Sequence, residues 1–267
     1  MSFPLSSQTV EAFRRDGAAP LYGHFADWVD TLRRGIDANI ASPSPIARIY
    51  DDDEGRRFFG DYCSWDRIPE YREFLFGSNA SGVAAALMGS ATARLFHEHV
   101  LVKEPGTSIA TPWHQDQPYY CVDGAMTCSL WLVLDPVPRE TTLEFVGGSH
   151  AWGRFFAPER FNKTPLYDAA TYEPLPDIEG HRGDYDILGW SLEPGDAVAF
   201  SFRTVHGAPP NRSLDKRRRA FSSRWVGDDA TFAIRPGMTS PPFPGVALAH
   251  GDPMDAPEFP LVWPKAS

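Results

Sequence analysis

The chain has 267 residues, 42% of them hydrophobic, and a formal net charge of −10 at neutral pH. A chain of this length predicts one large domain that buries enough apolar surface to fold without disulfides. The negative charge argues against nucleic acid and anionic membranes as partners. We expect a cytoplasmic protein for two reasons. The three cysteines have no paired spacing, and neither a signal peptide nor an apolar run of membrane length is visible.

The first ninety residues show helical periodicity. Apolar residues recur at helical spacing in four stretches, which predict helices over residues 8–16, 25–41, 68–76 and 80–88. From Ala93 the pattern changes to short runs of β-branched and aromatic residues between turn residues. These runs predict strands over residues 94–103, 113–120, 126–134, 142–146, 197–202, 204–207 and 218–227.

Helices followed by many short strands predict a mainly β protein, in which N-terminal helices support a jelly-roll core. The 25 prolines and 22 glycines agree with a core rich in turns. We expect one domain, with helical support over residues 1–92, a core over 93–235 and a surface tail over 236–267. Residues 151–187 lack periodicity and form an insertion of the kind that often covers a binding site.

A histidine and an aspartate stand two residues apart in a strand-like run, at His114 and Asp116. Residues i and i+2 of a strand share a face, so both side chains can hold one metal ion. His206, in a later strand-like run, is the candidate third ligand. Two histidines and one carboxylate form the facial triad of non-haem Fe(II) oxygenases, which leaves positions open for a co-substrate and O2. The arginines at 217–219 could then hold the far carboxylate of 2-oxoglutarate in a bidentate pair.

Four motifs together resemble the phytanoyl-CoA dioxygenase family. They are TPWHQDQPYY, SLWLVLDPVPRETTLEFVGGSH, EPGDAVAFSFRTVHGAPPNRS and RRAFSSRWVGDD, and the resemblance covers residues from about 95 to 229. Members of this family are Fe(II)- and 2-oxoglutarate-dependent oxygenases built on a double-stranded β-helix. The resemblance therefore implies that this chain uses Fe(II), 2-oxoglutarate and O2, and that it hydroxylates a small-molecule metabolite.

Carried over residue by residue, the resemblance implies that the iron ligands are His114, Asp116 and His206. It identifies Arg218 as the 2-oxoglutarate anchor and Trp131 as a tryptophan near the co-substrate, with plain core packing as the alternative for Trp131. Strand alternation places Arg218 on the face opposite Arg217 and Arg219, and a register shifted by one residue stays open.

Two positions bear on the expected activity. Related halogenases replace the carboxylate ligand with a small residue so that chloride can bind iron. Because Asp116 is present, the resemblance favours hydroxylation. The family often carries a hydroxyl residue two positions after the distal histidine, where this chain has Ala208; Thr204 or Ser222 are the candidates to compensate.

A competing interpretation concerns His97, His99 and Glu104, which have the spacing of a cupin metal site. The alternative function is therefore a cupin-type metal enzyme, or a binding protein, that does not use 2-oxoglutarate. The glycines that flank a cupin motif are missing, since Ala91 and Thr111 occupy those places, so we prefer two histidines on a pocket wall or a polar strand face.

Overall fold

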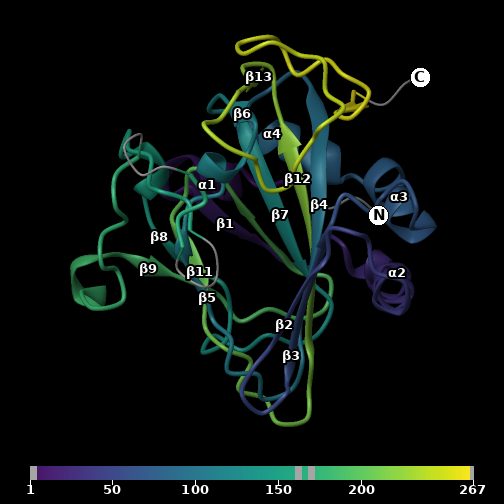
Figure 1. Ribbon diagram of the computed structural model, residues 1–267, viewed down its shortest axis with the longest axis vertical. Coiled ribbons are helices and arrows are strands. Elements are labelled where there is room, and N and C mark those ends of the chain that lie inside the picture. Colours follow the sequence, from purple (N-terminus) through teal and green to yellow (C-terminus); the bar gives the residue numbers. More distant parts are fainter. Residues whose placement is uncertain (1–4, 160–163, 168–171, 265–267) are drawn as a thin grey trace.

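The computed structural model describes residues 5–159, 164–167 and 172–264. Two antiparallel β-sheets form its core, with the smaller sheet at the left of Figure 1 and the larger sheet at the centre. The larger sheet has the order β1 (Ala18–Leu21), β10 (Ala197–Phe200), β7 (Thr127–Val133), β12 (Arg218–Val226), β4 (Ala93–Lys103), β3 (Arg57–Tyr62) and β2 (Arg48–Asp51), with β14 (Leu261–Trp263) paired to β4.

The smaller sheet has the order β5 (Thr111–His114), β11 (His206–Ala208), β8 (Glu144–Val146) and β9 (Ile187–Leu188). A separate pair consists of β6 (Val122–Asp123) and β13 (Thr231–Phe232). Two facing antiparallel sheets behind N-terminal helices confirm the expected mainly β, jelly-roll class.

The α-helices of the described chain all precede β4 and pack on the outside of the larger sheet; they are α1 (Ser7–Asp16), α2 (Val29–Ala41), α3 (Pro69–Gly77) and α4 (Ala80–Met88). Phe221 of β12 shows this packing, since its ring centroid lies 4.8 Å from that of Tyr71 and 5.4 Å from that of Phe74. Burying one such side chain stabilises the fold by roughly 2–3 kcal/mol. None of the described helices has both the length and the apolar character that crossing a membrane requires.

Strand β4 shows how alternation separates the outer core from the inner wall. Val100 and Val102 belong to the hydrophobic cluster under the helices, whereas His99 and Lys103 line a cavity between the sheets. The helices therefore fix which face of each strand points inward.

The N-terminal region differs from the purely helical support expected for residues 1–92. It also contains the strands β1, β2 and β3, of which β3 pairs with β4 and β2 pairs with β3. Strands β1 and β2 have only four residues each, and β2 is an edge strand without an apolar face. Such short segments give no reliable period-2 signal, which explains why the sequence pattern missed them.

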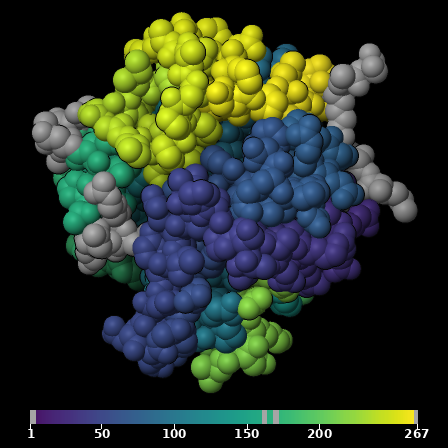
Figure 2. All heavy atoms as spheres, turned by 45° about the vertical axis from the view of Figure 1, so that its right-hand side comes forward, coloured from purple at the N-terminus to yellow at the C-terminus, as the bar shows by residue number. Residues whose placement is uncertain are grey.

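The C-terminal segment is more than the surface tail expected for residues 236–267. Strand β14 pairs with β4, Phe259 is completely buried, and residues 238–242 line the cavity. In Figure 2 this yellow segment spreads over the top of the molecule, above the helices in purple and blue. The proline-rich composition suggested a surface segment, but a few of its apolar side chains, among them Phe259 and Val262, are buried.

Candidate metal centre

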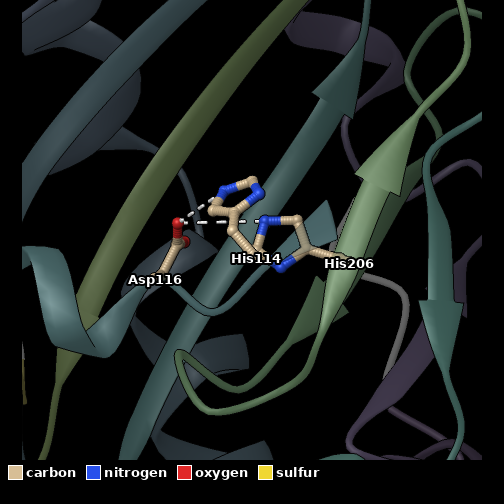
Figure 3. Close-up of side chains that lie close together, drawn as sticks. All are labelled: His114, Asp116 and His206. Carbon is tan, nitrogen blue, oxygen red and sulfur yellow. Dashed lines mark ion pairs between the residues drawn. The ribbon is translucent and has the colours of Figure 1, made fainter. Parts of the chain in front are cut away.

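Strands β5 and β11 bring the two histidines of the candidate centre together. They pair antiparallel, and His114 and His206 are direct partners in the register. Asp116 follows two residues after His114, where the chain enters the short 3-10 helix Gln117–Tyr119. Figure 3 shows the three side chains pointing toward one another.

The distances within this group suit a common ligand. Oδ1 of Asp116 lies 3.5 Å from Nε2 of His114 and 3.8 Å from Nε2 of His206. The donor atoms all lie within 4.8 Å of one another, and no other group of three or more such side chains in the described part of the chain could hold a metal ion. The residues expected to be ligands are therefore assembled at one point.

Backbone carbonyl groups orient both imidazoles. Nδ1 of His114 lies 2.8 Å from the carbonyl oxygen of Pro112, and Nδ1 of His206 lies 2.9 Å from that of Thr204. A carbonyl oxygen only accepts, so each Nδ1 carries the proton and each Nε2 presents a lone pair to the centre. Burial and the neighbouring His114 lower the pKa of His206 to about 3, which keeps that ring uncharged at neutral pH.

The second oxygen of Asp116 has partners of its own. Oδ2 lies 3.4 Å from Nε of Arg224 and accepts a hydrogen bond of 3.4 Å from the hydroxyl of Ser129. Burial by itself raises the pKa of this carboxyl group, but Arg224 and the two histidines outweigh that effect and hold the pKa well below its usual range. Asp116 is therefore a carboxylate whose Oδ1 alone faces the histidines.

A cavity of about 890 Å³ opens from this centre between the sheets. The inner faces of β2, β3, β4, β7 and β12 line it on one side, and β5 and β11 on the other. The described parts of the insertion and residues 238–242 line its mouth. Its size suits a small-molecule ligand together with a co-substrate.

Arg218 lies inside this cavity, whereas its two neighbours lie outside. Its guanidinium is buried and donates to the carbonyl oxygens of Thr141 and, at 3.4 Å, Pro209. Arg217 instead pairs with Glu104, and Arg219 with Asp135, each at 2.7 Å. This is the arrangement that strand alternation predicts for the three arginines.

Lys103 is a second buried basic side chain beside Arg218. The two residues are register partners on β4 and β12, and Nζ of Lys103 donates 3.3 Å to the carbonyl oxygen of Pro209. Burial lowers the pKa of Arg218 to about 10, and burial together with Arg218 lowers the pKa of Lys103 well below its usual range. Neither cation has a carboxylate partner within the described residues, so this end of the cavity is suited to an anion. From the sequence, a solvated strand end was slightly favoured for Lys103 over a pocket cation; the structure shows the opposite, because the side chain is buried in the cavity wall.

The sequence also singled out Trp131, Ser222 and Thr204, of which the first two line the cavity. Trp131 is buried in the core and also lines the cavity, next to Ser222 across the strand pair. Ser222 lines the cavity with a hydroxyl that has no hydrogen-bond partner in the described chain. The hydroxyl of Thr204 donates 2.7 Å to the carbonyl oxygen of Gly17, so Thr204 does not compensate for Ala208.

The cupin set is not assembled. His97 and His99 face the cavity, but the carboxylate of Glu104 lies on the outside, where it pairs with Arg217. The three side chains therefore cannot hold one metal ion. His97 and His99 instead belong to the cavity wall, one of the two positions that we preferred for them from the sequence.

Tyr119 links the candidate centre to the segments at the mouth. Its ring centroid lies 5.8 Å from that of His114, and its hydroxyl donates 2.7 Å to the carbonyl oxygen of Glu159 in the insertion. Its own carbonyl oxygen accepts a 2.9 Å hydrogen bond from the backbone of Ser240. The sequence named Tyr119 among the aromatic residues that could line a pocket, with core packing as the alternative, and the structure places it in the cavity lining. Arg224 was not singled out, although it is the third inward residue after Arg218 on the same strand.

Comparison with known proteins agrees with this geometry. The sequence pattern of the phytanoyl-CoA dioxygenase (PhyH) family matches residues 13–220, so the chain belongs to that family, as its motifs predict. A Caenorhabditis elegans protein named probable phytanoyl-CoA dioxygenase is 24% identical over 174 residues, which are 63% of this chain and 51% of that protein. The chain thus spans about half the length of the curated relative it matches.

Solved structures share the fold over nearly the whole chain. The non-heme alpha ketoglutarate dependent carbocyclase SnoK from nogalamycin biosynthesis is 26% identical, with a TM-score of 0.74 over 97% of this chain and 96% of its own. The epimerase SnoN, in complex with Fe3+, alpha ketoglutarate and nogalamycin RO, is 24% identical, with a TM-score of 0.73 over 96% and 97%. EctD from S. alaskensis, with 2-oxoglutarate and 5-hydroxyectoine, is 19% identical, with a TM-score of 0.69 over 94% and 86%.

Proposed function

We propose that this protein is an Fe(II)- and 2-oxoglutarate-dependent dioxygenase that hydroxylates a small-molecule substrate. The observation that carries the proposal is that a facial set of two histidines and a carboxylate opens into the same cavity as two buried cations without a carboxylate partner. Family membership supports it, as does the likeness to SnoK, whose name states dependence on alpha ketoglutarate.

The residues present fit both groups. His114, Asp116 and His206 would hold Fe(II) through two Nε2 atoms and Oδ1, the donor set of a non-haem iron oxygenase. Arg218 would hold the far carboxylate of 2-oxoglutarate, with Lys103 beside it. When bound, these groups supply oxidation by O2, in which 2-oxoglutarate leaves as succinate and CO2 and the substrate gains one oxygen atom.

The chain itself contributes orientation and exclusion of water. The backbone carbonyls of Pro112 and Thr204 fix the tautomers of the histidines, so that the lone pairs need no rearrangement. The insertion and residues 238–242 narrow the mouth of the cavity. Such walls keep bulk water from the reacting centre and decide which C–H bond of a substrate lies nearest to it.

Asp116 favours hydroxylation over halogenation. A halogenase needs an anion position on the metal, and here a carboxylate with its own buried partner Arg224 fills that position. Mass spectrometry of products formed in high chloride tests this point: a hydroxylated product without chlorine is expected. A chlorinated product from the unmodified protein would contradict the assignment.

The overall proposal is tested by co-substrate consumption. Protein loaded with Fe(II) and supplied with O2 should convert 2-oxoglutarate to succinate, slowly without a substrate and faster with a pool of metabolites. His206→Ala should abolish the conversion, whereas Arg219→Ala, outside the cavity, should retain it. Succinate release that does not require iron, or that survives in His206→Ala, would refute the proposal.

A further inference from the structure

A row of polar side chains crosses three adjacent strands on the cavity wall. His99 of β4 has Tyr62 of β3 as its register partner on one side and Ser222 of β12 on the other. All three line the cavity. His99 lies four residues before Lys103 on β4, and Ser222 lies four residues after Arg218 on β12, so the row is separate from the cation pair.

His99 is the accessible member of this row. Its side chain is partly exposed, and none of the hydrogen bonds of the described chain involves its ring. The ring stands edge-on to Tyr62, with centroids 5.3 Å apart, and a Cβ atom on Gly60 would lie 3.3 Å from its Nε2. A glycine at position 60 therefore leaves room for this orientation of the imidazole.

Polar atoms of the neighbouring side chains also lack partners. The hydroxyl of Tyr62, Nε2 of His97 and the hydroxyl of Ser222 are buried without a hydrogen bond in the described chain. Buried polar groups normally find partners, because leaving them unpaired costs free energy. These unpaired atoms make the wall around His99 polar.

The charge of the row indicates which ligand chemistry it suits. Burial, Arg224 and His114 lower the pKa of His99 to about 3, so its imidazole is uncharged at neutral pH and can both donate and accept. Arg224, the cation whose charge acts on His99, is already paired with Asp116. The three residues of the row therefore offer hydrogen bonds to an uncharged oxygen, and none of the three is a cation at neutral pH.

The facing wall includes an aromatic and apolar part. Trp113, Tyr119 and Phe156 line the cavity from the side of the smaller sheet and the insertion, and Ile178 lies beside them. Aromatic walls of this kind bury flat or apolar bodies. A ligand that fits both walls has an apolar body and an uncharged oxygen substituent on its β4 side.

We propose that His99, flanked by Tyr62 and Ser222, binds a hydroxyl or carbonyl oxygen of a largely apolar substrate. This inference rests on the proposed function, because it assigns part of the substrate site of the same cavity. It predicts that the site discriminates against anionic substrates at this position.

Three small aromatic probes test the proposal: 2-naphthol, 2-methylnaphthalene and 2-naphthoate, which share a ring and carry a hydroxyl, a methyl and a carboxylate. Dissociation constants are measured anaerobically with protein loaded with Fe(II) and 2-oxoglutarate. The wild type should bind 2-naphthol about fivefold to tenfold more tightly than either analogue, the gain of one hydrogen bond. His99→Phe should abolish this preference, whereas His99→Gln should retain part of it.

Leu101→Met serves as the control, because it changes the shape of the same strand face without removing a hydrogen bond. The affinity for 2-oxoglutarate, measured first, should be equal in the wild type and in His99→Phe. Absence of a hydroxyl preference in the wild type would overturn the proposal, and so would a preference that persists in His99→Phe. A loss of 2-oxoglutarate affinity in His99→Phe would assign the row to the co-substrate instead. Failure of the wild type to bind 2-oxoglutarate would refute the proposed function itself.

Discussion

Arg224 forms a buried ion pair with Asp116, its Nε 3.4 Å from Oδ2, on the side of the carboxylate away from the two histidines. The guanidinium lies over the ring of Tyr120, 5.7 Å from its centroid, and has no other carboxylate partner in the described chain. Because one carboxylate oxygen is held by Arg224, only the other is free to bind a metal. Arg224 is thus a positioning residue for the candidate ligand.

Replacing Arg224 by Gln should weaken Fe(II) binding by about tenfold to a hundredfold, the usual effect of losing a partner of a metal ligand. Arg224→Lys should lose less, since it keeps the charge. Anaerobic titration with Fe(II) measures both, and Arg219→Gln is the matched control because its pairing with Asp135 lies outside the cavity. Unchanged affinity in Arg224→Gln would show that Asp116 needs no such support.

Arg218→Ala should weaken the binding of 2-oxoglutarate by more than tenfold, because the loss of a buried charge-assisted pair costs about 2–5 kcal/mol. Arg219→Ala should bind normally, since that side chain points outward. The anaerobic absorbance change on adding 2-oxoglutarate to the Fe(II) protein reports both affinities. A large loss in Arg219→Ala, or in neither variant, would mean that the anchor lies elsewhere.

The insertion should gain protection from hydrogen exchange when Fe(II), 2-oxoglutarate and substrate bind. Its described parts line the mouth, and Tyr119 joins Glu159 to the candidate centre through the hydroxyl. Peptides covering residues 151–159 and 172–185 report the effect; residues 160–163 and 168–171 lie outside the described structure. Tyr119→Phe, which removes only the hydroxyl, should reduce the gain. Equal protection with and without ligands would make the insertion a fixed structural loop rather than a lid.

The metal-free protein should lose stability as the pH falls below about 6.5, partly through His99. Its folded-state pKa is about 3, against an ordinary value of 6.5, so the unfolded chain binds a proton over a pH range in which the folded chain does not. The contribution of His99 is therefore complete above pH 6.5 and is lost progressively between pH 6.5 and 3. Between pH 7 and 5 this amounts to on the order of 1–2 kcal/mol.

Urea unfolding of the wild type and of His99→Phe at these two pH values checks the effect, because all other titrating groups are common to both proteins. The wild type should lose more stability than the variant. Parallel losses would show that His99 titrates normally in the folded state.

The sequence indicated which side chains would lie together, because their positions obey local rules. His114 and Asp116 are two positions apart, and the inward position of Arg218 follows from alternation along one strand. Arg224 and Lys103 also lie on strands whose alternation is clear, but nothing local marks an arginine as the partner of a distant carboxylate. Such pairings depend on how β12, β4 and the turn after β5 meet in space.

The short strands at the N-terminus escaped prediction for another reason. Tyr62 and Gly60 become part of the cavity wall only because β3 pairs with β4. Strand β3 has six residues, too few for a clear alternation of polar and apolar side chains in the sequence. The tail was misjudged because its composition is dominated by prolines, while a single buried side chain such as Phe259 decides its position. In each case tertiary pairing, not local propensity, determines the structure.

Anaerobic titration with Fe(II) of the wild type and of His114→Ala tests the central claim most directly, with His181→Ala as the control because that histidine is exposed. The account predicts tight binding of one Fe(II) per chain by the wild type and by His181→Ala, and a large loss of affinity in His114→Ala. Equally tight, stoichiometric binding by His114→Ala would remove this residue from the metal centre and contradict the account.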